Sequence, residues 1–159
     1  YWRQTKLPVV IGRFFNVVGP RQTGAYGMVL PRFVEAALAG RPLQVHDDGA
    51  QTRCFAHVDD VVGAVIDLTE HAETAGEIFN IGSDQPISIL ELAQEVIART
   101  KSSGSIEFQS YHEAYDKDFE DIRKRVPDLT KIKRTLNYAP KYTLGEIIDD
   151  VAAQQKSTP

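Results

Sequence analysis

Two runs of consecutive apolar, β-branched and aromatic residues dominate the hydrophobic pattern of the chain. The first covers residues 9–18 and the second residues 77–82. A continuous apolar run is typical of a strand buried on both faces, as in a parallel sheet. A parallel sheet needs more than two strands, so we expect these strands to complete a sheet that begins elsewhere. The long segment between them is expected to form a small α/β lobe. The predicted fold class is therefore α/β.

Apolar residues at helical spacing predict helices between and after these strands. Ser88 and Glu91 form a capping box at the start of one of them. Asp59 and Asp60 precede another, and we interpret one as its N-cap and the pair as complementing its dipole, rather than as acid-base groups. The apolar faces of the remaining predicted helices are Phe33, Val34, Ala37 and Leu38 (a helix from Pro31, capped by Gly40), Leu129, Ile132 and Leu136 (from Pro127-Asp128), and Leu144, Ile147, Ile148 and Val151.

A hairpin is predicted in the middle of the chain. Residues 43–46 alternate as a short strand, Asp47-Asp48-Gly49 is a turn sequence, and residues 52–58 form another extended run. Residues 21–26 and 111–121 are predicted to be irregular.

Charge and composition exclude several classes of protein. The formal net charge is -4 and the sequence pI is about 5.6, which argues against a general nucleic-acid binder. Cys54 is the single cysteine, and no stretch approaches the roughly 20 apolar residues of a membrane span. We therefore expect a cytoplasmic protein without disulfides. The chain begins at Tyr1 without an initiator Met or a signal-peptide pattern, so we expect it to be part of a longer protein.

Three phrases occur in the order and spacing of a known family. They are residues 13–20 (RFFNVVGP), residues 51–61 (QTRCFAHVDDV) and residues 79–82 (FNIG), followed by a closing helix after Pro127-Asp128. This ordered set resembles the NAD-dependent nucleotide-sugar epimerases and dehydratases, which are extended short-chain dehydrogenases. The resemblance implies the C-terminal part of a Rossmann-like parallel sheet with a substrate-binding lobe, spanning residues 1–159. It also implies NAD as cofactor, a UDP- or dTDP-sugar as substrate, and a homodimeric parent protein.

The family's catalytic and cofactor-binding motifs are missing from this chain. No GxxGxxG fingerprint for the NAD pyrophosphate occurs, and Tyr1 and Lys6 do not fit the family's YxxxK pair because the Lys is one residue too far. The chain is therefore expected to carry the substrate side and to be inactive alone. The resemblance implies that Phe14 and Phe15 abut the nicotinamide, although both also suit an ordinary core.

The remaining family positions point to a nucleotide-sugar site. The resemblance assigns Asn16 to the substrate, although a strand-end turn is an alternative role. It places Met28 and Val29 over the nucleotide, and Gln44, Val45 and His46 against the base, with His46 as the stacking candidate or a structural residue.

Arginine is expected to bind the diphosphate. The resemblance assigns Arg53 this role, because a guanidinium binds phosphate oxygens bidentately, and the alternative is a surface ion pair with Asp47 or Asp48. The family's second arginine lies in an RPGD phrase that this chain lacks, and two alternatives follow: Arg123 or Arg125 substitutes for it from a shifted position, or both are solvated charges. Cys54 stands where the family commonly has Asp, and a decarboxylase branch also has Cys there.

The expected reaction of the parent protein starts with oxidation of the sugar at C4 by NAD. Re-reduction on the other face gives 4-epimerisation, elimination gives 4,6-dehydration, and loss of a C5 carboxylate gives decarboxylation. We expect UDP-glucose-type 4-epimerisation first, with 4,6-dehydratase or UDP-glucuronate decarboxylase activity as alternatives. A non-catalytic sugar-nucleotide-binding module is a further alternative.

Overall fold

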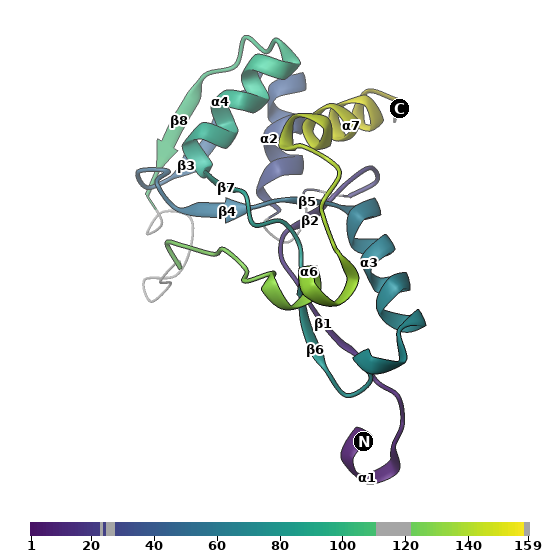
Figure 1. Cartoon of the computed structure of the whole chain (residues 1–159). Coiled ribbons are helices and arrows are strands. Elements are labelled where there is room, and N and C mark those ends of the chain that lie inside the picture. The colour runs from purple at the N-terminus through teal and green to yellow at the C-terminus, as the bar shows by residue number, and fades with distance from the viewer. Residues whose placement is uncertain (23, 25–27, 111–121, 158–159) are drawn as a thin grey trace.

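A computed structural model describes residues 1–22, 24, 28–110 and 122–157, and it divides into two groups of elements (Figure 1). The sheet unit consists of β1 (Ile11–Phe14), β6 (Ile78–Ile81), α3 (Val58–Glu70) and α6 (Thr130–Leu136). The lobe consists of α2 (Val29–Leu38), β3 (Leu43–His46), β4 (Thr52–Cys54), β7 (Pro86–Ser88), α4 (Ile89–Thr100), β8 (Ile106–Gln109) and α7 (Leu144–Ser157). The strands β2 (Val17–Val18) and β5 (Ala56–His57) join the two, and a short α1 (Trp2–Thr5) and a 3₁₀ turn (Ala72–Thr74) flank the sheet unit. The α/β class is confirmed. The predicted irregular stretch 111–121, with residues 23 and 25–27, lies outside the described residues.

The sheet unit is a parallel pair with aligned carboxyl ends. Ile11 pairs with Ile78 and Phe14 pairs with Ile81. The side chains of Phe79 and Ile81 are buried against apolar residues of α3 and α6. The predicted second strand is thus confirmed as β6.

The first predicted strand is shorter and more exposed than expected. Residues 9–18 divide into β1 and β2 because Asn16 has a left-handed backbone (φ 39°), which redirects the chain so that β2 pairs with β5. Ile11 and Phe14 are 53% and 58% exposed, so the prediction of burial on both faces is wrong for β1. The reason is that, within the described part of the chain, β1 pairs with β6 alone and keeps one free edge.

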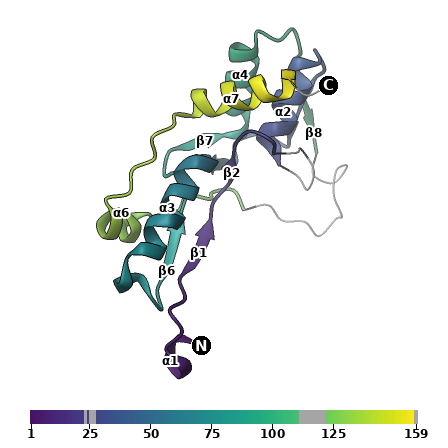
Figure 2. The same ribbon diagram turned by 90° about the vertical axis from the view of Figure 1, so that its right-hand side faces the viewer.

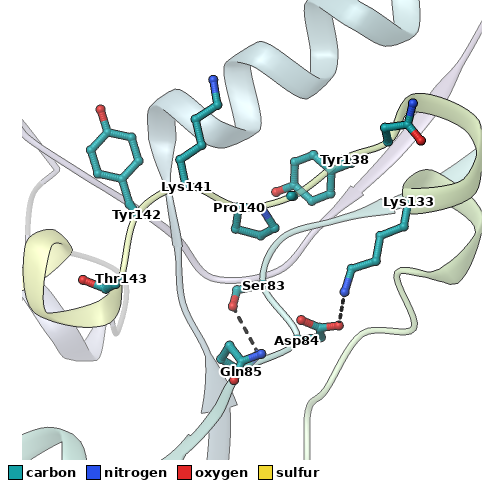
Figure 3. A pocket seen from close by; sticks show the side chains of 11 residues that line it. Ser83, Asp84, Gln85, Lys133, Tyr138, Pro140, Lys141, Tyr142 and Thr143 are labelled. Atoms are coloured by element: carbon teal, nitrogen blue, oxygen red, sulfur yellow. Dashed lines mark hydrogen bonds and ion pairs between the residues drawn. The ribbon is translucent and has the colours of Figure 1, made fainter.

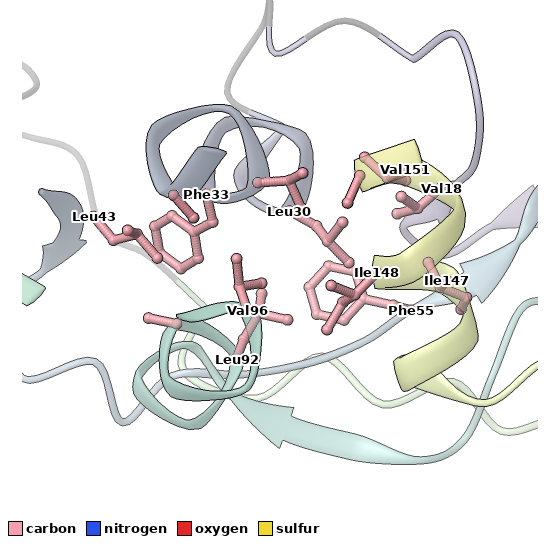
Figure 4. Close-up of a cluster of buried hydrophobic side chains, with 14 of the residues drawn as sticks. Val18, Leu30, Phe33, Leu43, Phe55, Leu92, Val96, Ile147, Ile148 and Val151 are labelled. Atoms are coloured by element: carbon pink, nitrogen blue, oxygen red, sulfur yellow. The ribbon is translucent and has the colours of Figure 1, made fainter. Parts of the chain in front are cut away.

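The lobe is built around three mutually packed helices. Figure 4 shows side chains from α2, α4 and α7 meeting in one apolar cluster, with Val18 and Phe55 at its border. Burial of these aliphatic side chains is the main favourable contribution to the lobe's stability. The cluster fixes α2, which forms one wall of the site described below.

The ends of three helices follow their local sequence. The capping box of α4 is confirmed, since Ser88 Oγ accepts from Glu91 N (3.1 Å) and Glu91 Oε2 accepts from Ser88 N (3.0 Å). Helix α2 begins at Val29, two residues before the predicted start, and Gly40 follows it with a φ of 63°, as its capping role requires. The two closing helices, α6 and α7, are also confirmed.

The cap of α3 differs from the prediction. His57 Nδ1, rather than an aspartate, accepts from Asp59 N (3.1 Å). Asp59 and Asp60 do lie in the first turn, but the Asp60 carboxylate faces inward and is only 8% exposed. The expectation that an aspartate caps α3 is wrong because the imidazole occupies that position.

The predicted hairpin is also wrong. A tight turn at Asp47 and Gly49 does follow β3, and both residues have positive φ. However, β3 pairs in parallel with β8, and β4 pairs antiparallel with β7, so the two strands are not partners. Within the described residues, no helix is long and apolar enough to cross a lipid bilayer.

Candidate functional site

A cavity of about 870 Å³ lies where β2 meets the lobe. Its walls are the first half of α2, the strands β3 and β4, the start of α4 and the β1–β2 junction. Its lining includes seven of the residues predicted from sequence, namely Asn16, Met28, Val29, Gln44, His46, Arg53 and Arg125. The chain therefore brings together most of the predicted nucleotide-sugar positions in one concave surface.

Asn16 lies on the cavity wall at the carboxyl end of β1, and it also has a structural role. Its Nδ2 donates to the carbonyl oxygen of Cys54 (2.8 Å), and its own carbonyl oxygen accepts from Ala56 N (3.2 Å). Its positive φ is a conformation that Asn tolerates better than most residues. The residue thus ties β1 to the β4–β5 segment at the site.

Arg53 and Arg125 reach the cavity from two adjacent segments. The segment 123–125 runs beside β4 as a parallel bridge, in which Thr52 N donates to Arg123 O (2.7 Å) and Arg125 N donates to Thr52 O (3.2 Å). Arg53 Nη1 donates to the carbonyl oxygens of Thr52 and Ile122, both at 2.9 Å. These bonds fix one terminal nitrogen of the Arg53 guanidinium. The cavity lining therefore includes two cationic side chains from neighbouring segments, Arg53 and Arg125.

Arg123 lies elsewhere. Its Nη1 is 3.1 Å from Asp48 Oδ2, its side chain is 75% exposed, and it does not line the cavity. Hydrogen bonding from Ala50 N and from Arg123 lowers the pKa of Asp48. The surface ion pair considered for Arg53 is therefore formed by Arg123, which leaves Arg125 as the candidate for the family's second diphosphate arginine.

Not all of the residues predicted to contact the nucleotide line the cavity. Gln44 and His46 lie on its lining, and Gln44 Nε2 donates to Glu107 Oε2 on β8 (2.8 Å). Val45 is fully buried in the lobe core and does not line the cavity, so the prediction that it lies against the base is wrong for this residue. Met28, the N-cap residue of α2, and Val29 line the opposite wall.

Phe14 and Phe15 lie outside the cavity, at the carboxyl end of β1. Phe14 is exposed, whereas Phe15 is half-buried with its backbone against Gly82. A Cβ at Gly82 would come within 3.2 Å of the Phe15 carbonyl oxygen, so this close approach favours glycine. The described part of the chain leaves Phe14 uncovered.

The cavity carries more positive charge than the sequence motifs indicate. Arg32 and Arg41 also line it, so the described residues of its lining include four arginines and one acidic residue, Glu35, although the chain as a whole has a net charge of -4. Arg41 Nη2 lies 2.8 Å from Glu35 Oε1. The sequence analysis did not identify Arg32, which lies on α2, or Arg41, which lies between α2 and β3. A charged residue at such a position is ordinarily expected to face solvent. The only sequence signal was that the two arginines lie near Met28 and Gln44 along the chain.

A second cavity, of about 520 Å³, lies beside α6 (Figure 3). Two connectors between the sheet unit and the lobe form its walls, residues 82–85 and 137–143. Its charged groups are largely engaged: Lys133 is paired with Asp84, and Tyr138 Oη donates to Gly82 O (2.8 Å) while burial raises the pKa of Tyr138 to about 12. This cavity contains no residue of the predicted site. Across the described ranges, no group of three or more His, Cys, Asp and Glu side chains could hold a metal ion.

Two curated proteins resemble this chain over most of its length. UDP-N-acetyl-alpha-D-glucosaminuronate decarboxylase from Bacillus cytotoxicus is 45% identical over 135 residues, covering 84% of this chain and 42% of that protein. UDP-glucuronic acid decarboxylase 2 from Arabidopsis thaliana is 39% identical over 146 residues, covering 92% of this chain and 31% of that protein. The chain thus spans less than half the length of these relatives.

The fold also matches a solved structure that contains ligands. The crystal structure of UDP-glucuronic acid 4-epimerase from Bacillus cereus, in complex with UDP-glucuronic acid and NAD, superposes with a TM-score of 0.86 at 27% identity and covers 98% of this chain and 48% of that one. The sequence model of the NAD dependent epimerase/dehydratase family matches residues 1–82, which is more than half of the chain. With its sequence phrases, its fold and its arginine-lined cavity in agreement, this chain belongs to the NAD-dependent epimerase/dehydratase family.

Proposed function

We propose that this chain is the substrate-binding part of an NAD-dependent enzyme that acts on a UDP-hexuronate, a UDP-sugar that carries a carboxylate at C6. The observation that carries the proposal is the pairing of Arg53 and Arg125 on one cavity with Asn16 at its sheet end. A diphosphate needs cationic, geometrically fixed donors, and a nucleoside with its sugar fits a cavity of about 870 Å³.

In this proposal the arginines hold the diphosphate and the lobe holds the nucleoside. Arg53 is anchored by two carbonyl oxygens, so its guanidinium has a defined orientation on the cavity. Met28 and Val29 cover the nucleotide from α2. Gln44 and His46 form the wall for the base, with uracil favoured over thymine because the curated relatives act on UDP-sugars by their names.

Asn16 would contact the sugar end of the substrate. It lies at the carboxyl end of a parallel strand, where open α/β sheets bind ligands. Because its Nδ2 is engaged by Cys54 O, we assign its carbonyl oxygen Oδ1 to accept from a sugar hydroxyl.

NAD, when bound, supplies the hydride acceptor for oxidation of the sugar at C4. The residues of this chain that fit the cofactor are Phe14 and Phe15, since an exposed ring at the carboxyl end of β1 offers a flat apolar surface to a nicotinamide. The pyrophosphate fingerprint and the YxxxK pair are expected in a preceding NAD-binding part. Its parallel strand would pair with the free edge of β1.

We favour decarboxylation as the reaction that follows oxidation. A ketone at C4 is β to the C6 carboxylate. When the C5–C6 bond breaks and CO₂ leaves, the electron pair of that bond is stabilised as the enolate of the C4 ketone. The two decarboxylases share 45% and 39% identity with this chain. The second candidate is 4-epimerisation, which the superposition on a UDP-glucuronic acid 4-epimerase favours. Both candidates act on the same substrate class.

Product analysis of the full-length gene product tests this proposal. The protein is incubated with NAD and either UDP-glucuronate or its 2-acetamido counterpart, and CO₂ and the nucleotide sugars are measured. A UDP-pentose with CO₂ supports decarboxylation, whereas a UDP-hexuronate inverted at C4 supports epimerisation. Turnover of UDP-glucose with neither uronate consumed would overturn the substrate class, and saturable UDP-sugar binding with no turnover would indicate a non-catalytic binding module.

A further inference from the structure

The family phrase His57-Val58-Asp59-Asp60 lies outside the nucleotide cavity but occupies the junction between the sheet unit and the lobe. The Asp60 carboxylate is 8% exposed and accepts three backbone hydrogen bonds, from Lys141 N (3.1 and 3.0 Å, one to each oxygen) and Tyr142 N (3.2 Å). Residues 141 and 142 belong to the connector that leads from α6 into α7 (Figure 2). Asp60 therefore fixes the point at which the chain enters α7.

His57 strengthens the same junction. Its ring stacks on Tyr142, with centroids 3.9 Å apart and planes 19° apart. Because Nδ1 accepts from Asp59 N, the proton of the neutral ring lies on Nε2, which faces Asp150 Oδ2 of α7 at 3.4 Å. The first turn of α3 thus contacts both the connector and the second turn of α7.

The other end of α7 contacts α2, which forms one wall of the nucleotide cavity. Gln155 Nε2 donates to the carbonyl oxygen of Pro31, which lies in the first turn of α2 and lines the cavity beside Met28 and Val29. Val151 packs in the same apolar cluster as Leu30. Helix α7 is therefore a continuous rigid element between the α3 junction and the wall of the cavity.

We propose that Asp60 and Gln155 are positioning residues for the nucleotide site, acting through α7 on the first turn of α2. The inference rests on the proposed function, because it assigns this wall to the nucleotide. Asp60 sets where α7 begins, and Gln155 transfers that placement to α2. Neither Asp60 nor Gln155 lines the cavity. Energetic coupling of this kind is carried by packed rigid elements and is established only by a double-mutant cycle.

The test uses the full-length gene product and measures the Kd of UDP and of UDP-glucuronate by calorimetry, well below the unfolding temperature. We expect Asp60→Asn and Gln155→Met each to raise both Kd values by roughly 2- to 30-fold, the range seen for residues that act through another element. The Kd of NAD should stay unchanged in both variants, since the family's NAD fingerprint is not part of this chain. A stability loss alone would not produce this split between the two ligands.

Gln155→Met also separates positioning from folding. The Oε1 atom of Gln155 is buried without a hydrogen-bond partner among the described residues, so removing the amide removes an unsatisfied acceptor as well as the bond to Pro31. The free energy of unfolding should change little while the Kd of UDP rises. Matched controls are Asp67→Asn, which makes the same charge change on the exposed face of α3, and Lys156→Met, which places the same new side chain on the exposed face of α7.

The double variant decides the inference. If the residues act through α7 in series, Asp60→Asn with Gln155→Met raises the Kd of UDP by clearly less than the product of the two single effects. Effects that simply multiply, or single variants that bind UDP like the unmodified protein, would overturn the inference and leave the proposed function standing. Failure of the unmodified protein to bind UDP or UDP-glucuronate would instead overturn the proposed function.

Discussion

The Asn16 side chain donates to the carbonyl oxygen of Cys54 from a backbone in the left-handed region, so one residue forms both a turn and a cross-link between strands. We expect Asn16→Ala to lower the free energy of unfolding by about 2 kcal/mol, because it removes a hydrogen bond and places a Cβ-bearing residue without a local polar partner at a φ of 39°. Urea denaturation measures the change. Asn16→Gly keeps the turn and loses only the bond, so it should cost about 1 kcal/mol, and an equal loss in both variants would contradict the role of the backbone conformation.

Three arginines close in sequence or space provide a test of the diphosphate site. Arg53→Ala and Arg125→Ala should each weaken UDP-sugar binding by about 1.5–3 kcal/mol, the range for charge-assisted hydrogen bonds, and should raise KM more than they lower kcat. Arg123→Ala removes the same charge from an exposed pair with Asp48 and should leave KM nearly unchanged. Steady-state kinetics of the full-length gene product provides the comparison. A KM that rises for Arg123→Ala and not for Arg125→Ala would reverse our assignment of the second arginine.

Cys54 should be inert in the folded protein. Its side chain is fully buried, and burial raises the pKa of its thiol to about 11, so almost no thiolate is present at pH 8. We expect modification by a thiol reagent to proceed only as fast as the protein opens, and to become rapid in denaturant. Fast, stoichiometric labelling under native conditions would show that β4 is exposed in solution.

Acid should destabilise the protein through carboxyls at helix starts. The hydroxyl of Ser88 and the backbone N–H of Thr143 lower the pKa values of Glu91 and Glu146, and hydrogen bonding to Thr130 lowers that of Asp128. A carboxyl whose pKa is lower in the folded state contributes stability above its unfolded pKa, and that stability is lost as the pH falls through the folded pKa. The melting temperature should therefore drop below about pH 4.5, near the unfolded pKa of Glu. Glu91→Gln and Glu146→Gln together should flatten this part of the curve, and an unchanged pH profile in that variant would exclude these carboxyls as its cause.

Local features of the fold were predictable from sequence, and pairings between distant segments were not. The capping box at Ser88 depends on residues three positions apart and was identified directly. The β3–β8 pairing joins Leu43 to Ile106, and no local pattern distinguishes it from a hairpin with β4. His57, and not an aspartate, caps α3, and its ring stacks on Tyr142, which lies 85 residues further along the chain. No local pattern indicates a contact over that distance.

The same distinction applies to the site. Family phrases located Asn16 and Arg53 because their spacing within each phrase is fixed. Whether Arg123 or Arg125 lies on the cavity depends on the register of their segment beside β4. In the folded chain that register is set by the parallel bridge between Thr52 and Lys124. Arg32 and Arg41 belong to no family phrase. Their place on the cavity follows only from how α2 and the connector to β3 lie in the folded chain.

The register of β1 and β6 has a consequence for how fast this protein reaches its native state. Ile11 pairs with Ile78, so the loop that the pair closes is 67 residues long (78 − 11) and contains the lobe strands β3 and β4 and the helices α2 and α3. Ordering such a loop costs entropy before any strand contact compensates, which makes parallel pairing intrinsically slow. The lobe helices, with their local contacts, should acquire structure first, and closure of β1 onto β6 should be the late step of folding.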